Sequence, residues 1–370
     1  MAKLGEVCLL KAGKFVSAND ISPEYNKGLY PCFGGNGIRG YVADYTHDGE
    51  FPLIGRQGAL CGNVNLAFGK FHATEHAVVV QPKIEMNVHW LYYALNAMNL
   101  GQYATGAAQP GLAVSKLETL SIEIPNISEQ NKIAQTLYKV EQLVNFRKQQ
   151  LAKLDELVKA RFFEMFGEIS DNSMNWDCFT IGKLISTIES GWSGNGKQRE
   201  KHADEIAVLK VSAVTKGYFI PTECKVLDDQ HNIKKYVYPQ KGDILFSRAN
   251  TKEMVGATVL IKKDYPDLIL PDKLWKIRFC TDVNPIYMKY VLSTTTVRNA
   301  FSAASTGTSG SMYNVSMEKF KGVIIPVPPL SVQNEFAAFV ERVDQQKQTV
   351  QQSLEKLELM KKALMQEYFG

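Results

Sequence analysis

The chain has 370 residues, of which 45% are hydrophobic and 22% are charged, and its formal net charge is +4. This length allows two or more domains with cores of their own, and so small a charge does not by itself predict a nucleic-acid partner. No apolar run approaches the roughly 18 residues of a membrane span and the apolar part of the N-terminus is too short for a secretory signal, so we expect a cytoplasmic protein.

The first segment, residues 1–127, is rich in Gly, Val, Ile, Tyr and Phe in short alternating runs, which predicts a mixed domain dominated by β-strands. Within it, GGNGIRGY from Gly34 to Tyr41 has the GxGxxG spacing of a dinucleotide-binding loop, and FGGNG fits the FxGxG of S-adenosylmethionine sites. A dinucleotide loop is followed directly by a helix whose amides hold the phosphates. Here a DG turn, a proline and more glycines follow instead, so we expect no nucleotide site.

Residues 128–167 are predicted to form one long helix. Apolar residues recur in alternating steps of four and three, with Arg147 filling the one gap, and this is the pattern of a coiled-coil seam. We expect Ser128 to cap the start of the helix and the polar EISDNSMNWD at 168–177 to act as a linker. The seam residues are Ile133, Leu137, Val140, Val144, Leu151, Leu154 and Val158.

The second globular segment, residues 168–330, is again predicted to be β-rich, with runs such as KGDILFSRANTKEMVGATVLI. NPIY, from Asn284 to Tyr287, comes close to the (N/D)PP(Y/F) motif of adenine methyltransferases but lacks the second proline. Asn is a natural N-cap and Pro a natural first helical residue. The corresponding NVHWLYYAL in the first segment keeps its Asn87 without the proline, so helix capping accounts for both copies.

Residues 331–370 repeat the long helix. They align without a gap on residues 128–167, with 15 identities in 40 positions. The repeat extends upstream, where TG and VS pairs recur at an offset of 201 residues. Ser331 is the expected N-cap, and the second seam is interrupted by Lys347 and Lys361. Equal seams in both copies suit two helices that pack on each other, and the second seam consists of Phe336, Val340, Val343, Val350, Leu354 and Leu357.

No pattern in the chain predicts catalysis. The six cysteines are at least 24 positions apart, and the six histidines form no HxH or HExxH pattern, so a metal site is unsupported. LPDKLWK at 270–276 has an acid and lysines without the (D/E)xK spacing of a nuclease, and no Ser/His/Asp or Cys/His arrangement stands out. We expect reduced cysteines, mostly buried, no cofactor and no metal.

Taken together, the motifs of both halves resemble the specificity subunit of type I restriction-modification enzymes. They include the repeated TG…VS…IP…QN pattern, GDILFSRANTKEMVG and YPCFGGNGIRGYV…LIGRQGALCGNV, and with the repeat they cover essentially the whole chain. The resemblance implies an α+β fold. It would have two mixed, β-rich target-recognition domains in pseudo-two-fold repeat, separated by two long helices that form an antiparallel coiled coil.

The resemblance also implies a function without a catalytic residue in this chain. Each domain would read one half of a bipartite double-stranded DNA target, as dimeric DNA-binding proteins read two half-sites. The helices would act as a spacer and bind methyltransferase subunits, and two such subunits are expected. A further subunit would carry the nuclease and the motor.

Candidate DNA contacts lie in or beside polar loops at strand ends. Arg56 and Arg248 align loosely, each at the end of an apolar strand, and arginine can form a bidentate pair with guanine. Gln57 or Asn250 could pair with adenine, and the other basic residues could contact bases or phosphates. The complete set is Arg39, Arg56, Gln57, Lys70, His72, Arg248, Asn250 and Lys252.

Two alternatives remain open at this point. FGGNG and NPIY would suit a DNA adenine methyltransferase with a fused recognition region, and the seams alone would suit a coiled-coil adaptor with no DNA role. Charge does not favour equal DNA binding by both halves. Residues 1–127 hold nine Lys and Arg against ten Asp and Glu, whereas residues 168–330 hold 21 against 17, so the first domain would rely on a local basic patch or on its partners.

Overall fold

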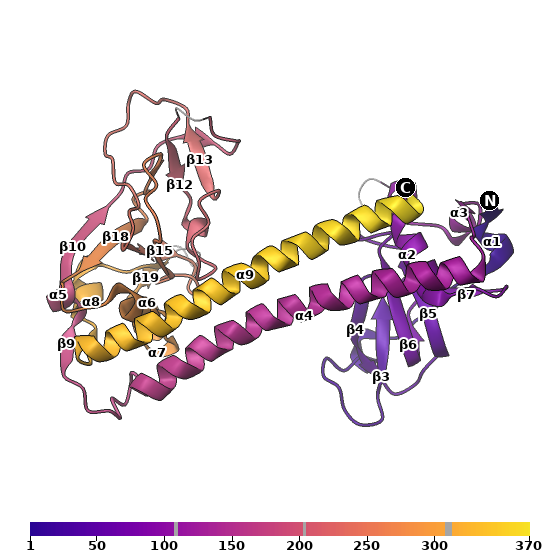
Figure 1. The fold of residues 1–370 in the computed structure, drawn as a ribbon, viewed down its shortest axis with the longest axis horizontal. Coiled ribbons are helices and arrows are strands. Elements are labelled where there is room, and N and C mark those ends of the chain that lie inside the picture. Colours follow the sequence, from indigo (N-terminus) through magenta and orange to yellow (C-terminus); the bar gives the residue numbers. More distant parts are fainter. Residues whose placement is uncertain (107–109, 203–204, 308–312) are drawn as a thin grey trace. The chain divides into compact units, whose positions relative to one another are not determined.

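The computed structural model describes residues 1–106, 110–202, 205–307 and 313–370. It divides into two compact units, which Figure 1 shows as ribbons: unit 1 comprises residues 1–150 and 350–370, and unit 2 comprises residues 151–349. Each unit therefore contains one end of both long helices. Parts of the predicted TG motifs, at 107–109 and 308–312, lie outside the described residues.

Unit 1 is built on a six-stranded sheet with the order β2-β7-β5-β6-β3-β4. Neighbouring strands are antiparallel except β3 and β6, which are parallel. A separate two-stranded ladder pairs β1 (Ala2–Lys3) with β8 (Ser121–Ile122). The sheet strands are β2 (Cys8–Ala12), β3 (Tyr30–Gly34), β4 (Gly37–Val42), β5 (His47–Gly55), β6 (Val64–Ala73) and β7 (Ala77–Pro82).

Helices cover one face of this sheet and form the core of unit 1 with it. Buried Ile54 and Val78 of the sheet pack in one cluster with Trp90 of α2, Leu137 of the first long helix, and the end of the second. Short 3-10 turns lie at Ala18–Asp20 and Leu100–Tyr103. The helices are α1 (Leu4–Val7), α2 (Val88–Ala97), α3 (Val114–Glu118) and the N-terminal part of α4 (Ile127–Phe166).

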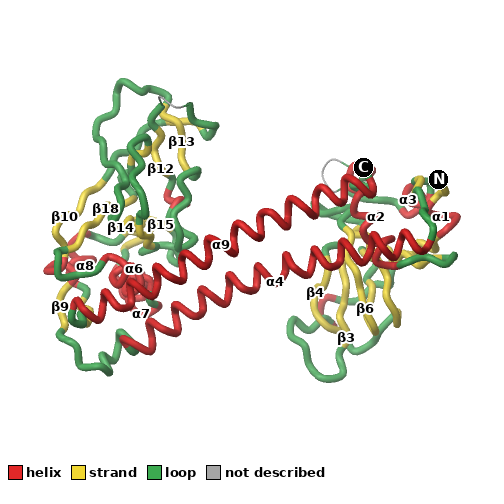
Figure 2. The backbone as a smooth tube through the Cα atoms, in the orientation of Figure 1, coloured by secondary structure: helices red, strands yellow, loops and turns green. Residues whose placement is uncertain are grey.

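Unit 2 contains two four-stranded sheets, β10-β18-β14-β16 and β11-β13-β12-β17, and Figure 2 separates its strands from its loops by colour. Two small ladders, β15-β20-β19 and β21-β9, complete it. The strands are β9 (Cys178–Thr180), β10 (Ile185–Ser190), β11 (Gly196–Lys197), β12 (Ala207–Leu209), β13 (Cys224–Leu227), β14 (Ile244–Ser247), β15 (Ala249–Asn250), β16 (Thr258–Leu260), β17 (Leu268–Ile269), β18 (Leu274–Phe279), β19 (Thr306–Gly307), β20 (Tyr313–Asn314) and β21 (Ile324–Pro326).

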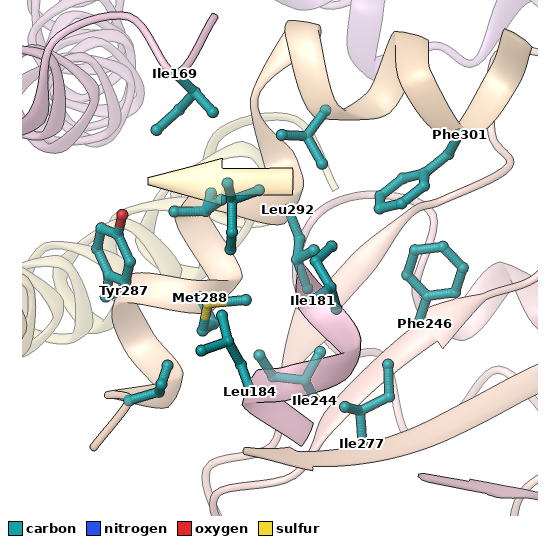
Figure 3. Packing of buried hydrophobic residues seen from close by; sticks show 14 of the residues in the cluster. Ile169, Ile181, Leu184, Ile244, Phe246, Ile277, Tyr287, Met288, Leu292 and Phe301 are labelled. Atoms are coloured by element: carbon teal, nitrogen blue, oxygen red, sulfur yellow. The ribbon is translucent and has the colours of Figure 1, made fainter. Parts of the chain in front are cut away.

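The main core of unit 2 lies between its first sheet and a group of helices. Figure 3 shows Phe246 of β14 facing Phe301 of α7, and their ring centroids are 5.1 Å apart in an edge-on arrangement. Tyr287 and Met288 of α6 are fully buried in the same cluster. The helices are the C-terminal part of α4, α5 (Ile181–Leu184), α6 (Pro285–Ser293), α7 (Thr295–Ala304), α8 (Met317–Gly322) and the N-terminal part of α9 (Leu330–Phe369), with a 3-10 turn at Val211–Ala213.

The sequence repeat is also a structural repeat. The strand order β2-β7-β5-β6 of unit 1 recurs as β10-β18-β14-β16 in unit 2, and the parallel pair of β3 with β6 recurs as β12 with β17. Individual backbone hydrogen bonds recur as well. The N–H of Leu4 donates to the carbonyl of Leu120 at 2.8 Å, and the N–H of Ile181 donates to the carbonyl of Val323 at 2.8 Å. The α+β class with two β-rich repeats is thereby confirmed.

GGNGIRGY forms the β3–β4 hairpin and leads through β4 into β5. NPIY begins α6, where the Asn284 side chain accepts a hydrogen bond from the N–H of Ile286 at 2.8 Å. Asn87 caps α2 in the same way through Trp90 at 2.9 Å. The predicted capping role of Asn87 and Asn284 is therefore confirmed, and GGNGIRGY forms a hairpin that no helix follows directly.

The two long helices begin one residue earlier than predicted. Asn126 accepts a hydrogen bond from the N–H of Glu129 at 3.0 Å and precedes α4, so Ser128 is not the N-cap. Ser331 likewise lies within α9, which starts at Leu330. Both cap predictions are wrong, because Asn126 caps α4 and α9 has already begun before Ser331. Across the described ranges, no helix is both long and apolar enough to cross a membrane.

The predicted seams lie at the contact between the two long helices within each unit. Most seam residues are buried, while Leu151, Leu154 and Leu357 are half-buried. In unit 1, Glu141 pairs with Lys361 at 2.6 Å and Lys148 pairs with Glu358 at 2.9 Å, which makes the pairing antiparallel.

The polar residues that interrupt the seams have partners on the other helix. In unit 1, Arg147 Nε donates to Ser353 Oγ at 3.1 Å. In unit 2, Lys347 Nζ and Asp155 Oδ1 are 2.6 Å apart. The interruptions are thus cross-helix polar contacts, a common way to fix the register of a coiled coil.

Candidate nucleic-acid interface

Two loops beginning with arginine occupy equivalent places in the two units. Arginine loop 1 (residues 56–61) connects β5 to β6, and arginine loop 2 (residues 248–255) leads from β14 toward β16. Each is closed at its base by a backbone bond from a glycine N–H, Gly62 to Gly55 at 2.7 Å and Gly256 to Ser247 at 2.8 Å. Both closing glycines have a positive φ, 88° and 80°, which disfavours other residues there.

The two arginines are held by the same backbone bonds. The backbone N–H of Arg56 donates to the carbonyl of His76 at 3.0 Å, and that of Arg248 donates to the carbonyl of Lys273 at 3.1 Å. Their carbonyls accept from Leu112 and Val315, each at 2.9 Å. The loose sequence alignment of Arg56 with Arg248 is therefore a structural equivalence.

The side chains of the two arginines differ in their surroundings, although both are half-buried. Arg248 Nε donates to the backbone carbonyl of Asp272 at 2.9 Å. Arg56 Nε is also shielded from solvent but has no hydrogen-bond partner among the described residues. Asp272 and its partner Ser193 were not among the predicted site residues, because they lie far from Arg248 in the sequence.

The other predicted residues of the arginine loops are only partly available. Gln57 is exposed, and its backbone forms a bridge with Gly111. Asn250 uses its amide locally: Oδ1 accepts from the N–H of Thr251 at 2.9 Å, and Nδ2 donates to Ser247 Oγ at 3.4 Å. Lys252 is exposed, and a bond at 3.4 Å from a serine hydroxyl involves only its carbonyl.

Arg39 projects from β4 as an exposed side chain. Its stem lies against Gly34, where an added Cβ would be 2.5 Å from Arg39 Cδ. The tip of the hairpin packs onto the end of β5 and the start of arginine loop 1, since a Cβ on Gly55 would be only 1.9 Å from the carbonyl of Gly35 and a Cβ on Gly35 would be 3.5 Å from the carbonyl of Gln57. These backbones approach closely because both residues are glycine.

Lys70 and His72 are not part of this assembly. Lys70 lies opposite Asp48 on the β5–β6 ladder, and its ammonium is 4.7 Å from the Tyr45 ring centroid. His72 is 8% exposed, and its Nε2 lies 3.1 Å from the carbonyl of Lys14. His72 therefore presents little surface to a ligand, and its role in DNA binding stays a prediction.

Within the part of the chain that the structure describes, no group of three or more His, Cys, Asp or Glu could hold a metal. The six cysteines are free thiols, of which Cys8, Cys32 and Cys224 are buried. Burial raises the pKa of the Cys8 thiol to about 11, so it stays protonated at neutral pH. Half of the six thiols are buried, fewer than the sequence led us to expect.

Comparison with known proteins gives the same family throughout. A family model described as the type I restriction modification DNA specificity domain matches residues 1–156 and 175–359. The chain is 53% identical over 143 residues to the EcoprrI type I restriction enzyme specificity subunit of Escherichia coli, which covers 38% of this chain and 36% of that protein. It is 27% identical over 334 residues to a putative type I specificity subunit of Haemophilus influenzae, which covers 86% and 80%.

Solved structures show the same fold. The S subunit of a type I restriction-modification system from M. genitalium matches 100% of this chain and 95% of its own, with a TM-score of 0.64 and 15% identity. A chain from a structure on complex assembly and conformational transition of the type I system matches 100% and 96%, with a TM-score of 0.53 and 14% identity.

Proposed function

The chain belongs to the type I restriction-modification DNA specificity family, and from this premise we propose that each of its units reads one half of a bipartite double-stranded DNA target. The relatives it matches are named specificity subunits, not methyltransferases. The protein is thus the recognition component of its system and not the catalytic one. Catalysis, in this proposal, belongs to other subunits.

The equivalence of the two arginine loops is the observation that carries the proposal. Arg56 and Arg248 have the same backbone bonds at the same place in two repeated units. A duplicated reading element suits a target with two half-sites. Arginine is also the residue that most often reads guanine in the major groove, through a bidentate pair.

The remaining candidates would support this reading. Arg39 lies on the hairpin that packs against arginine loop 1, and Lys252 is exposed in arginine loop 2. We assign them to nearby bases or phosphates, together with Gln57. Asn250 would need to release its local hydrogen bonds before it could pair with adenine, so we rank it below the arginines. Lys70, which lies outside the arginine loops, would contact a phosphate.

The proposal extends to partners and place of action. The protein would work in the cytoplasm with two methyltransferase subunits and a restriction subunit that carries the motor. The paired helices would bind the methyltransferase subunits and set the length of the unread DNA between the half-sites. One of the similar structures comes from work on complex assembly of the type I system, which supports such partners.

The methyltransferase alternative loses its sequence support. FGGNG lies in a β-hairpin and NPIY caps a helix. Neither motif therefore supports a cofactor site or a catalytic site. The adaptor alternative does not account for the family match or for the paired arginine loops.

Methylome sequencing of cells that express this chain with a methyltransferase partner tests the proposal directly. We expect one methylated bipartite motif that disappears when this chain is omitted. The purified chain alone should neither bind S-adenosylmethionine in calorimetry nor methylate DNA. Methyl transfer by the isolated chain, or a methylation motif that does not depend on it, would overturn the proposal.

A further inference from the structure

In unit 2 the Arg248 side chain is bonded to Asp272, which Ser190 and Ser193 bond in turn; we call this arrangement the bracket. The backbone carbonyl of Asp272 accepts a hydrogen bond from Arg248 Nε at 2.9 Å and another from Ser190 Oγ at 3.2 Å. Ser193 Oγ donates to the Asp272 carboxylate and accepts from the Asp272 N–H at 3.3 Å. Asp272 therefore holds Arg248 with its backbone while Ser190 and Ser193 hold Asp272.

The two serines are fixed in place by the backbone between them. An added Cβ on Gly191 would be 1.9 Å from the carbonyl of Leu270, so the segment presses directly onto the strand end that precedes Asp272. Trp192 donates its N–H to the same carbonyl at 2.9 Å. The backbone that carries the two serines is thus packed against the fold, while the Ser193 side chain itself is exposed.

Unit 1 has the same framework without the bracket. Gly13 makes the equivalent approach, since its added Cβ would be 2.0 Å from the carbonyl of Ala73, and Lys14 donates to that carbonyl at 2.8 Å. Counting from these glycines, Ala12 stands in the place of Ser190 and Phe15 in the place of Ser193. Neither residue carries a hydroxyl.

The loss of the bracket coincides with an unpartnered arginine. Arg56 Nε is buried and lacks a hydrogen-bond partner in the described ranges. Glu75, at the place of Asp272, directs its carboxylate to His76 at 3.1 Å. The repeat therefore offers a natural comparison between a supported and an unsupported arginine at one position of the fold.

We propose that Ser193 and Asp272 are positioning residues that hold the Arg248 guanidinium in one orientation for guanine. As a result, unit 2 discriminates more sharply between bases at the position read by Arg248 than unit 1 does at the position read by Arg56. This inference rests on the proposed function. Because Nε is occupied by the Asp272 carbonyl, the two Nη atoms remain for the bidentate pair with O6 and N7. A donor that is fixed before binding loses less entropy on binding and tolerates a wrong acceptor less well.

The test uses the complete complex of this chain with its methyltransferase partner. Methylation rates are measured on DNA with the matched target and with every single base-pair substitution in both half-sites. The position at which Arg248→Ala relaxes discrimination is the position that Arg248 reads. Ser193→Ala should reduce the ratio of matched to mismatched rates at that position by about three- to tenfold, the net size of a typical hydrogen bond in a protein.

Several controls separate positioning from stability. Ser193 is exposed, so Ser193→Ala should leave the melting temperature unchanged, and Ser193→Thr should restore discrimination because it keeps the hydroxyl. Ser293→Ala removes a hydroxyl that bonds only within α6, to Lys289 at 2.6 Å, and should leave the profile unchanged. In the Arg248→Ala background, Ser193→Ala should have no additional effect.

The outcomes distinguish the two claims. If Arg248→Ala relaxes one half-site while Ser193→Ala keeps the wild-type profile, positioning is refuted and the proposed function stands. A loss of discrimination after Arg56→Ala that equals or exceeds the loss after Arg248→Ala refutes the asymmetry. If Arg248→Ala leaves both half-sites unchanged, the reading role of Arg248 fails and this inference fails with it.

Discussion

Gln333 Oε1 accepts a hydrogen bond from the backbone N–H of Asn284 at 2.8 Å, and Gln130 and Asn87 repeat this bond at 2.9 Å. Both glutamines are buried, with exposed fractions of 0% and 2%. Their amide nitrogens each donate to a proline carbonyl at 2.8 Å. The bonds tie the start of α6 to α9 in unit 2, and the start of α2 to α4 in unit 1.

Replacement of Gln333 should therefore destabilise unit 2. Gln333→Ala leaves the N–H of Asn284 and a proline carbonyl unpaired in a buried place, and we expect a loss of about 2 to 3 kcal/mol in the free energy of unfolding. Urea unfolding followed by tryptophan fluorescence measures it. Gln345→Ala, on the exposed side of the same helix, should change this free energy by less than about 0.5 kcal/mol. Equal effects of the two substitutions would contradict a stabilising role for the hydrogen bond between Gln333 and Asn284.

The two arginines should act on different half-sites. Arg248→Ala should relax or abolish recognition of one half-site and leave the other intact, and Arg56→Ala should do the reverse, so each variant is the control for the other. A bidentate arginine–guanine pair contributes about 1 to 3 kcal/mol of discrimination. Methylation of substituted bipartite oligonucleotides by the complete complex measures it. Equal loss at both half-sites in either variant would count against the assignment.

The helices should set the length of the unread spacer. One heptad inserted after Leu151 and one after Leu354, which are equivalent positions of the repeat, lengthens each helix by about 10 Å, or about three base pairs at 3.4 Å each. Methylome sequencing should show a longer spacer with unchanged half-sites. A heptad in one helix only is the control, since it breaks the pairing register and should lower activity. An unchanged spacer in the double insertion is incompatible with the proposal.

Lys289 should make the stability of unit 2 depend on pH. Burial lowers the pKa of Lys289 to about 8. The neighbouring charges of Lys347 and Lys262 also lower this pKa, while the charge of Asp344 raises it. In the unfolded chain its pKa is near 10.4, so the unfolded state binds more protons between these values. The free energy of unfolding should therefore rise as pH increases through this window.

The measurement compares variants across that window. Urea unfolding at pH 7.5, 8.5 and 9.5 should show a flatter pH dependence for Lys289→Met than for the wild type, together with higher stability at pH 7.5. Lys159→Met, which removes an exposed lysine of α4, should retain the wild-type dependence. Parallel curves for the wild type and Lys289→Met would show that Lys289 is not the group responsible.

Self-similarity and periodicity were sufficient for the architecture. The repeat of 15 identities in 40 positions predicted two equivalent units, because equal sequences make equal local bonds. The seams followed from heptad spacing. The sequence also marked Arg147, Lys347 and Lys361 as interruptions of the seams, and each of them has a polar partner on the other helix. The equivalence of Arg56 and Arg248 was also present in the alignment.

Tertiary structure decided which side chains are available and what holds them. The first long helix is capped by Asn126 and not by Ser128, and the His72 side chain is only 8% exposed. The bracket around Arg248 joins Ser193 and Asp272, which are 79 positions apart. Neither composition nor periodicity specifies such a contact, since it arises only when the chain folds back and a glycine lets two backbones touch. The sequence by itself thus determined the repeated framework and its arginines, and the fold determined how differently the two arginines are held.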